Sequence, residues 1–431
     1  MKKIIATLLL ALVFTFSISA VSLCKDPVTI KIWIASQPAA VIDWLQVFAK
    51  EFNEANPDIV VDIEHYSNVQ NLRDKVIVST AAGIGPDLFY EASNNISRWI
   101  ISGLAEPIDK YFNAKPDKND FIPDILNLVR YKGQTYGMPF VMWPIFSLYN
   151  LDLFAQGGVT EPQNWDEMIT AARKLTRTNG NTIETFGWRT AGTNNTLAFG
   201  DLQLSMEQLG STTIPIDGLQ ATMNTPEGLL AMRYLQDLRD AGMPGSNGGN
   251  QMKDVYAGKV AIQHWASTNV DFLQTLQTSS TQGLNFGMRR FVGPTPGTDM
   301  IVAFAGVLVM SSVSKNPNET WRVLDAFVSP ENMRSYLVAR EFNQTVRRSQ
   351  AVDPVLLRIP YQKELMQLMH APLTTSGSKH PYYPQFRDAV GKQLVDALMG
   401  RQSVEAALKE GERLLNAIVA SENAANNNFI H

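Results

Sequence analysis

The chain has 431 residues, of which 45% are hydrophobic and 18% are charged, a composition that is ordinary for a soluble globular protein and a length sufficient for two lobes. Lys and Arg total 37, and Asp and Glu total 41, so the formal net charge is −4. Because this near balance lacks the basic footprint of a nucleic-acid-binding protein, we expect no nucleic-acid partner.

Residues 1–22 have the order of features that is typical of a secretory signal peptide. Lys2 and Lys3 give a positive start, residues 4–16 are apolar, and small residues surround Ala20 and Ser22. The apolar run is too short for a comfortable transmembrane helix, and no later segment approaches a span of about 20 apolar residues. We therefore expect an exported, soluble mature chain.

Cys24 is the only cysteine, which excludes a disulfide within the chain. Its place just after the apolar run is compatible with a lipid-modified N-terminus, although Leu23 stands where bacterial lipoproteins usually have a small residue. Ordinary cleavage after Ala20 or Ser22 accounts for the region equally well. We expect a periplasmic or cell-surface protein, and both origins of its N-terminus stay open.

Residues 28–90 alternate between strand and helix patterns. Strands are predicted at residues 28–34, 59–63 and 88–90 from their β-branched and alternating side chains. Helices are predicted between them, the first with apolar residues at helical spacing from Val41 to Phe52. This β-α-β-α-β order indicates a parallel sheet with helices on its faces.

The middle of the chain continues the α/β pattern. Residues 145–149 are predicted to be a strand that crosses to another lobe. Asn164 with Glu167 three positions later forms a helix-capping pattern, and Pro226 begins a helix that ends near Gly242.

Later segments supply further strands and then mainly helices. Residues 260–262, 283–291 and 302–310 are predicted strands. The Gly-Pro-Thr-Pro-Gly run at 293–297 is the strongest break in the chain and predicts a lobe boundary. Beyond Asp353 the sequence is mostly helical.

Sequence signatures of catalysis and metal binding are missing. The chain contains no HExxH, GxxxxGK[ST], GxSxG or CxxC motif, and its five histidines lack metal-ligand spacing. We expect no enzymatic activity, no cofactor and no metal site.

Aromatic and polar residues follow several predicted strands. A sugar packs its C–H face on an aromatic ring and needs polar side chains around its hydroxyls. In open α/β sheets such sites lie beyond the carboxyl ends of the strands. The residues at these ends include Trp33, Ser36, Gln37, Glu91, Ser93, Asn94, His264, Trp265 and Ser267. A core position for Trp33 is as compatible with the sequence as a binding role.

Segments in order along the mature chain resemble the family of extracellular solute-binding proteins that includes maltose-binding protein and other sugar-binding components of ABC importers. The similar segments are residues 48–59, 79–90, 103–108, 136–139, 148–154, 164–167, 257–262 and 400–408. The resemblance implies two α/β lobes of the type II periplasmic-binding-protein fold, each with a mainly parallel sheet flanked by helices and joined by a hinge. The expected lobes are residues 28–145 plus 300–345, and 146–299 plus 346–431.

The resemblance also implies a ligand and its contacts. The family's cleft positions correspond here to Glu91, Asn94, Trp143, Trp265 and, near a late helix, Tyr383 or Phe386. Trp188 lies in a loop that varies in the family, and Arg189 is a further candidate for holding hydroxyls.

We expect a monomeric, non-catalytic protein that binds a mono- or oligosaccharide and delivers it to transmembrane permease subunits of an ABC importer. Ala35-Ser36-Gln37 is less acidic than is common in the family, which leaves the identity of the sugar open. The alternatives are a binder of another small polar solute, such as a polyamine, and a carbohydrate-active enzyme.

Overall fold

The computed structural model describes residues 26–190, 194–215, 219–245, 251–267, 278, 283–340, 344–359, 361–369, 373–374, 380 and 382–425. The predicted signal peptide and Cys24 lie outside these residues. Among the residues described, none of the helices is both long enough and apolar enough to cross a membrane.

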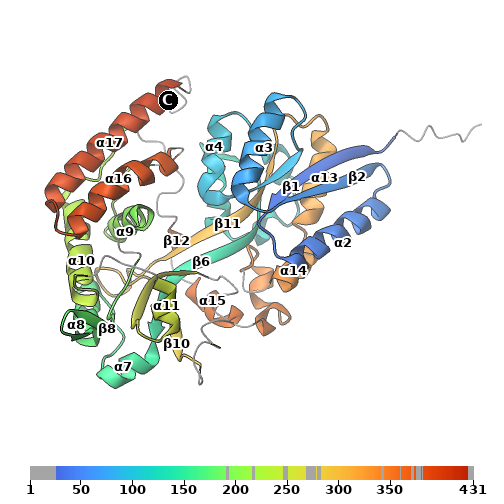
Figure 1. The fold of residues 1–431 in the computed structure, drawn as a ribbon. Coiled ribbons are helices and arrows are strands. Elements are labelled where there is room, and N and C mark those ends of the chain that lie inside the picture. The colour runs from blue at the N-terminus through green and yellow to red at the C-terminus, as the bar shows by residue number, and fades with distance from the viewer. Residues whose placement is uncertain are drawn as a thin grey trace, which may run out of the picture.

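The first lobe is built on the predicted parallel strands, β1 (Val28–Ala35), β2 (Ile59–Tyr66) and β3 (Leu88–Ala92). β1 lies between β2 and β3 and pairs in parallel with both, which confirms the predicted β-α-β-α-β unit. Helix α2 (Ala39–Ala55) buries the stripe Val41, Leu45, Phe48 and Phe52 predicted from helical spacing. These strands run from the outer end of the lobe toward the centre of the molecule (Figure 1).

Shorter elements complete the first lobe. They are α3 (Val69–Ala81), η1 (Ser93–Asn95), α4 (Ile96–Ile101), α5 (Asp109–Phe112), η2 (Lys118–Asp120), α6 (Pro123–Asn127), the hairpin β4 (Arg130–Tyr131) and β5 (Gln134–Thr135), α13 (Pro317–Phe327), α14 (Pro330–Arg340), η3 (Ser349–Val352) and η4 (Leu356–Arg358).

Two long antiparallel strands, β6 (Met138–Asn150) and β11 (Ile301–Met310), join the lobes. β11 pairs with β3 on one side and with β6 on the other, so β6 continues the sheet of the first lobe into the second. Thirteen strand residues span roughly 40 Å, enough to run through both lobes. The predicted crossing at 145–149 is the second half of β6.

The second lobe surrounds the end of β6. Its elements are α7 (Leu151–Gly157), α8 (Trp165–Leu175), β7 (Arg177–Asn179), β8 (Thr182–Thr185), α9 (Asn195–Gln208), α10 (Pro226–Gly242), α11 (Gln251–Tyr256), β9 (Ile262–Ser267), β10 (Phe286–Arg289), α15 (Gln362–Leu368), β12 (Leu373–Thr374), α16 (Tyr383–Leu398) and α17 (Val404–Ala425). Asn164 caps α8 with Glu167, as predicted. β9 and β10 both pair antiparallel with β6, and β11 pairs antiparallel with β3 and β6, so the predicted parallel arrangement holds for β1, β2 and β3 and not for these strands.

Two separate cores underlie the lobes. The first core takes its buried apolar residues from 30–142 and 303–356, and the second core takes them from 146–301 and 365–419. We propose that the lobes divide the chain as these cores do. The sequence predicted that the chain passes from the first lobe to the second for the last time at residue 346. Because Val346 and Leu356 pack in the first core, this division places that last boundary beyond Leu356.

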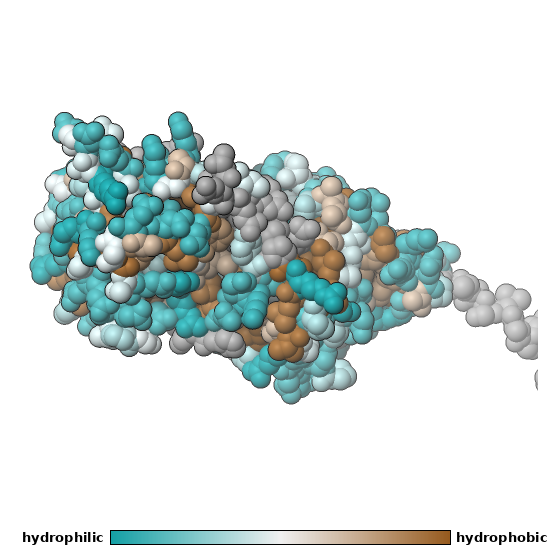
Figure 2. Space-filling model, turned by 90° about the horizontal axis from the view of Figure 1, so that it is seen from below, coloured by the Kyte–Doolittle hydropathy of each residue, from teal (hydrophilic) through white to brown (hydrophobic). Residues whose placement is uncertain are grey.

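The face seen from below is mostly hydrophilic, with smaller hydrophobic patches nearer the middle of the molecule (Figure 2). Among the described residues, the large apolar side chains that are clearly exposed include Val352 at 74% and Val78 at 68%. They belong to different elements, η3 and α3, which is the scattered exposure usual for a globular surface.

Candidate functional site

A small aromatic cluster lies where β6 and β11 pass from one lobe to the other. We call it the junction cluster. Its members are the buried residues Ile145, Leu204, Phe291 and Val302 and the partly exposed residues Trp143, Trp265, Met300 and Phe304. Its buried members belong to neither of the two large cores, and it includes two tryptophans predicted from the sequence, of which Trp143 also packs against the first core.

Strand register places Trp143 and Trp265 beside the same buried residues. Trp143 on β6 is opposite Phe304 on β11, and Ile145 is opposite Ser267 at the end of β9. Trp143 and Trp265 each pack against the buried members of the junction cluster. Both rings are partly exposed, which distinguishes them from the core aromatics.

Trp265 is held in an uncommon backbone conformation. Its φ is 57°, in the left-handed region that a bulky side chain seldom adopts. The indole Nε1 donates a hydrogen bond to Asp201 on α9, and the ring lies against Gly200, where an added Cβ would be 3.0 Å from the indole Cζ2. Backbone strain of this kind persists only where surrounding contacts fix it, and it is concentrated at functional sites.

Asp201 organises the polar groups beside that ring. It is 2% exposed, and its Oδ1 lies 3.3 Å from His264 Nε2, while Thr190 Oγ1 donates to Oδ2 over 3.4 Å. The His264 ring packs against Phe291 with centroids 4.5 Å apart. A carboxylate, an imidazole and two aromatic rings are thus fixed relative to one another on the second-lobe side of the junction.

Trp188 and Arg189 lie behind this group. Trp188 is 1% exposed, and its ring centroid is 5.5 Å from that of His264. Arg189 is also 1% exposed, forms an ion pair with Asp254 and stacks over Phe186 at 4.3 Å. In this conformation both side chains support the strand that carries His264 and Trp265, and neither is on the surface.

The two predicted residues on α16, Tyr383 and Phe386, differ in how far they are buried. Tyr383 is partly exposed at the start of the helix, with its ring 5.7 Å from that of Phe199 on α9. Burial raises the pKa of its hydroxyl to about 12, so it remains a hydrogen-bond donor at neutral pH. Phe386 is fully buried and packs on His380 at 4.7 Å.

On the first-lobe side, Glu91 is the centre of a polar network. It is fully buried and accepts hydrogen bonds from Arg73 Nε at 2.9 Å, Arg73 Nη2 at 2.6 Å and Trp99 Nε1 at 2.8 Å. The hydrogen bonds between Arg73 and Glu91 raise the pKa of the Arg73 guanidinium. Glu91 is therefore saturated by partners from α3 and α4 in this conformation.

Gln37 is occupied in a similar way. Its Oε1 accepts from Tyr336 at 3.0 Å and from Arg340 at 3.1 Å, and its Nε2 donates to the Ala35 carbonyl at 2.8 Å. The preceding Ser36 is exposed and has a φ of 56°, the left-handed region again.

The remaining two predicted residues lie near these networks. Trp33 is 5% exposed with its ring 5.7 Å from that of Tyr66, which fits the core interpretation left open by the sequence. Asn94, in η1, is partly exposed and accepts a hydrogen bond from Asn95. Among the groups that sequence reasoning missed are Asp201, Phe291 and Phe304.

Comparison with known proteins gives a family match over most of the chain. A family model described as "Bacterial extracellular solute-binding protein" matches residues 37–334. A binding protein of Brucella abortus (strain 2308) is 25% identical over 415 residues, which cover 94% of this chain and 96% of the relative. A maltotriose-binding protein of Pyrococcus abyssi is 31% identical over 146 residues, 33% of this chain and 30% of that protein.

The fold also matches solved structures. The crystal structure of a cyclic alpha-maltosyl-1,6-maltose binding protein from Arthrobacter globiformis superposes with a TM-score of 0.75 at 18% identity, covering 92% of this chain and 100% of that one. At this identity the match shows a shared fold, the two-lobed α/β architecture described above.

Proposed function

Because this chain belongs to the bacterial extracellular solute-binding protein family, we propose that it binds a carbohydrate between its lobes and delivers it to the permease subunits of an ABC importer. The family predicted from the sequence motifs is thereby confirmed, and members of this family are binding proteins. We further propose an exported, monomeric protein without catalytic activity and without a nucleic-acid partner.

The observation that carries the carbohydrate proposal is the junction cluster. Trp143, Trp265 and Phe304 offer partly exposed aromatic faces at the crossing between lobes, and Asp201 and His264 lie beside them. Sugars need this combination of a flat apolar face and adjacent hydrogen-bonding groups. The maltotriose-binding relative supports the same ligand class.

Closure of the lobes would complete the site. β6 and β11 cross between the cores, so a rotation about these strands would move the first-lobe groups around Gln37 and Asn94 relative to Trp265. A ligand held by both lobes favours the closed arrangement, which is the form we expect the permease to recognise.

A cationic ligand such as a polyamine is less well supported. It would need unpaired carboxylates near the aromatic faces, with the rings acting through cation–π contacts. Glu91 is already paired with Arg73 and Trp99, and Asp201 with Trp265 and His264. A glycosidase, the other alternative, would need two available carboxyl groups across a glycosidic bond, and the same pairing disfavours it.

The test is a thermal-shift screen against mono- and oligosaccharides, followed by calorimetry with the sugar that raises the melting temperature most. We expect Trp265→Ala to weaken binding of that sugar by about 2–4 kcal/mol, the range of a buried aromatic anchor. Trp44→Ala is the matched control, since Trp44 is partly exposed on α2 and belongs to the first core. Unchanged affinity in Trp265→Ala would contradict the stacking role, and stabilisation by spermidine instead of sugars would favour the polyamine alternative.

A further inference from the structure

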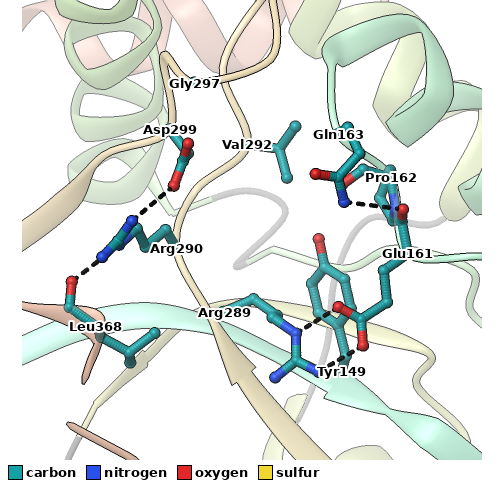
Figure 3. Close-up of a pocket in the computed structure, with 10 residues that line it drawn as sticks. All are labelled: Tyr149, Glu161, Pro162, Gln163, Arg289, Arg290, Val292, Gly297, Asp299 and Leu368. Carbon is teal, nitrogen blue, oxygen red and sulfur yellow. Dashed lines mark hydrogen bonds and ion pairs between the residues drawn. The ribbon is translucent and has the colours of Figure 1, made fainter. Parts of the chain in front are cut away.

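A pocket of about 240 Å³ lies in the second lobe, apart from the junction cluster (Figure 3). Its walls include Tyr149 at the end of β6, Glu161 before α8, Arg289 at the end of β10, and Val292 and Asp299 on the connection from β10 to β11. None of the sugar-site residues predicted from the sequence lines it.

The pocket and the junction cluster lie on opposite sides of one pair of chain segments. Phe291 and Met300 exchange backbone hydrogen bonds of 2.8 and 3.0 Å, and both side chains belong to the junction cluster. Their neighbours Val292 and Asp299 line the pocket instead. Because adjacent side chains in extended backbone point to opposite faces, the two sites are neighbours but share no side chain.

The charges of the pocket cancel. Arg289 donates through Nε and Nη2 to both carboxylate oxygens of Glu161, and Arg290 Nη1 lies 3.3 Å from Asp299 Oδ2. Arg290 Nε also donates to the Leu368 carbonyl at 2.9 Å. With both guanidinium groups already paired, an anion would find no unpaired cation among the described lining residues, and a cation would meet neutralised carboxylates.

Tyr149 contributes a buried hydroxyl that lacks a hydrogen-bond partner among the described residues. The residue is 1% exposed, and stacking of its ring on Phe154, at 5.2 Å and 11°, fixes its direction. Figure 3 shows the hydroxyl directed into the pocket, toward the space between Val292 and Gln163. Burial raises the pKa of this hydroxyl, so it stays protonated and able to donate. An unsatisfied buried donor is costly and calls for a partner.

We propose that this pocket is a second binding site, for a small neutral polyhydroxy compound of monosaccharide or short-polyol size. One ligand oxygen accepts the Tyr149 hydrogen bond, and other ligand hydroxyls donate to the carboxylate lone pairs of Glu161 and Asp299 that the arginines leave free. The volume lies below the roughly 300–1,000 Å³ of sites for drug-sized ligands, which limits the ligand to a small molecule.

The site is tested in Trp265→Ala protein, in which binding at the junction cluster is weakened, and a probe is assigned to the pocket by its response to substitutions in the pocket walls. The probes are D-mannitol, D-glucose and glycerol, with spermidine and citrate as charged controls, all measured by calorimetry. We expect at least one neutral probe to bind and both charged controls to fail. Adding Tyr149→Phe should weaken that probe roughly tenfold, the loss of one hydrogen bond. The matched control Tyr136→Phe, on the first lobe, should leave its affinity unchanged, because Tyr136 donates to Gln134 and is remote from the pocket.

Stability separates a binding effect from misfolding. Without a probe, Tyr149→Phe should keep or raise the melting temperature, because it removes an unsatisfied hydroxyl. Val292→Phe, which fills part of the pocket from another wall, should weaken the same probe independently. The proposal is overturned if no neutral probe binds the Trp265→Ala protein, if Tyr149→Phe and Val292→Phe leave binding intact, or if a charged control binds instead. These outcomes do not depend on whether the junction cluster binds sugar.

Discussion

The two lobes present different chemistry toward their junction. On the first lobe, the polar groups after β1 and β3 are bonded to one another: Glu91 with Arg73 and Trp99, and Gln37 with Tyr336 and Arg340. On the second lobe, Trp265 keeps a partly exposed ring, while Asp201 binds only its polar edge.

This difference separates residues with a structural role from residues available to a ligand, which the sequence alone predicts as one set of binding residues. A saturated network such as that of Glu91 positions backbone and rings, because each of its acceptors is already used. A ring fixed at its edge leaves its face available for a ligand. We therefore propose that the second lobe supplies the recognition surface in this conformation and that the first lobe supplies a rigid wall against it.

Glu91→Gln is the change expected to have the largest effect, and that effect should be on stability. Replacing the carboxylate leaves the Arg73 guanidinium without its counter-ion and puts an amide donor among other donors, in a site where Glu91 is fully buried. Breaking a buried pair in this way costs about 3–5 kcal/mol, and we expect the lower end because Arg73 is 18% exposed. Denaturant unfolding measures this loss.

Glu51→Gln serves as the control for that experiment. Glu51 is exposed on α2, so its substitution should stay within about 0.5 kcal/mol. If Glu91→Gln instead kept its stability and lost sugar affinity, Glu91 would be a ligand contact, and the distinction drawn between the lobes would fail.

Asp201→Asn probes the second lobe and should act on affinity. Asn can still accept from the Trp265 indole, but it loses the charge that strengthens this bond and the carboxylate oxygen's contact with His264 Nε2. Looser orientation of the ring should weaken the best sugar by about 1–2 kcal/mol, measured by calorimetry. Asp325→Asn is the matched control: Asp325 pairs with Lys115 in the first lobe, away from the ring, and its loss should leave sugar affinity within error. Equal effects of the two variants would argue against a specific role for Asp201.

Much of the fold could be predicted from local sequence. The stripe from Val41 to Phe52 and the cap at Asn164 depend on residues three or four positions apart, so their signals are contained within one helix. The strand-end rule and the family resemblance led to Trp143 and Trp265 for a similar reason, because each residue is predicted from the sequence of the strand that contains it.

The remaining contacts of the site join residues that are far apart in the sequence, so the structure was needed to find them. Arg73 reaches Glu91 from α3, and no sequence spacing indicates that this carboxylate will be paired. Asp201 lies in α9, a helix whose residues from Ala198 to Met206 are all buried. Because this helix has no separate apolar and polar faces, its sequence does not predict the direction in which Asp201 points. Phe304 lies on β11, where nearly every neighbour is buried and alternation gives no direction. Long-range packing decided each of these positions.

Gly200→Ala should have the smallest effect and gives the sharpest test of ring placement. The added Cβ would lie 3.0 and 3.1 Å from two atoms of the Trp265 ring, so the ring must move by a few tenths of an ångström. Alanine gains about 1 kcal/mol of helix propensity over glycine, which offsets this contact, and we expect nearly unchanged stability. Sugar affinity should fall a few-fold, because stacking depends on ring position.

The same substitution in Trp265→Ala protein isolates the contact between Gly200 and the ring. Without the indole, nothing opposes the added methyl group, and Gly200→Ala should stabilise the chain by about 1 kcal/mol in denaturant unfolding. The difference between the two backgrounds is the coupling free energy between Gly200 and the ring. A coupling free energy of zero would mean that the Trp265 ring is not held against α9. The second lobe would then lack the fixed aromatic face that distinguishes it from the first lobe.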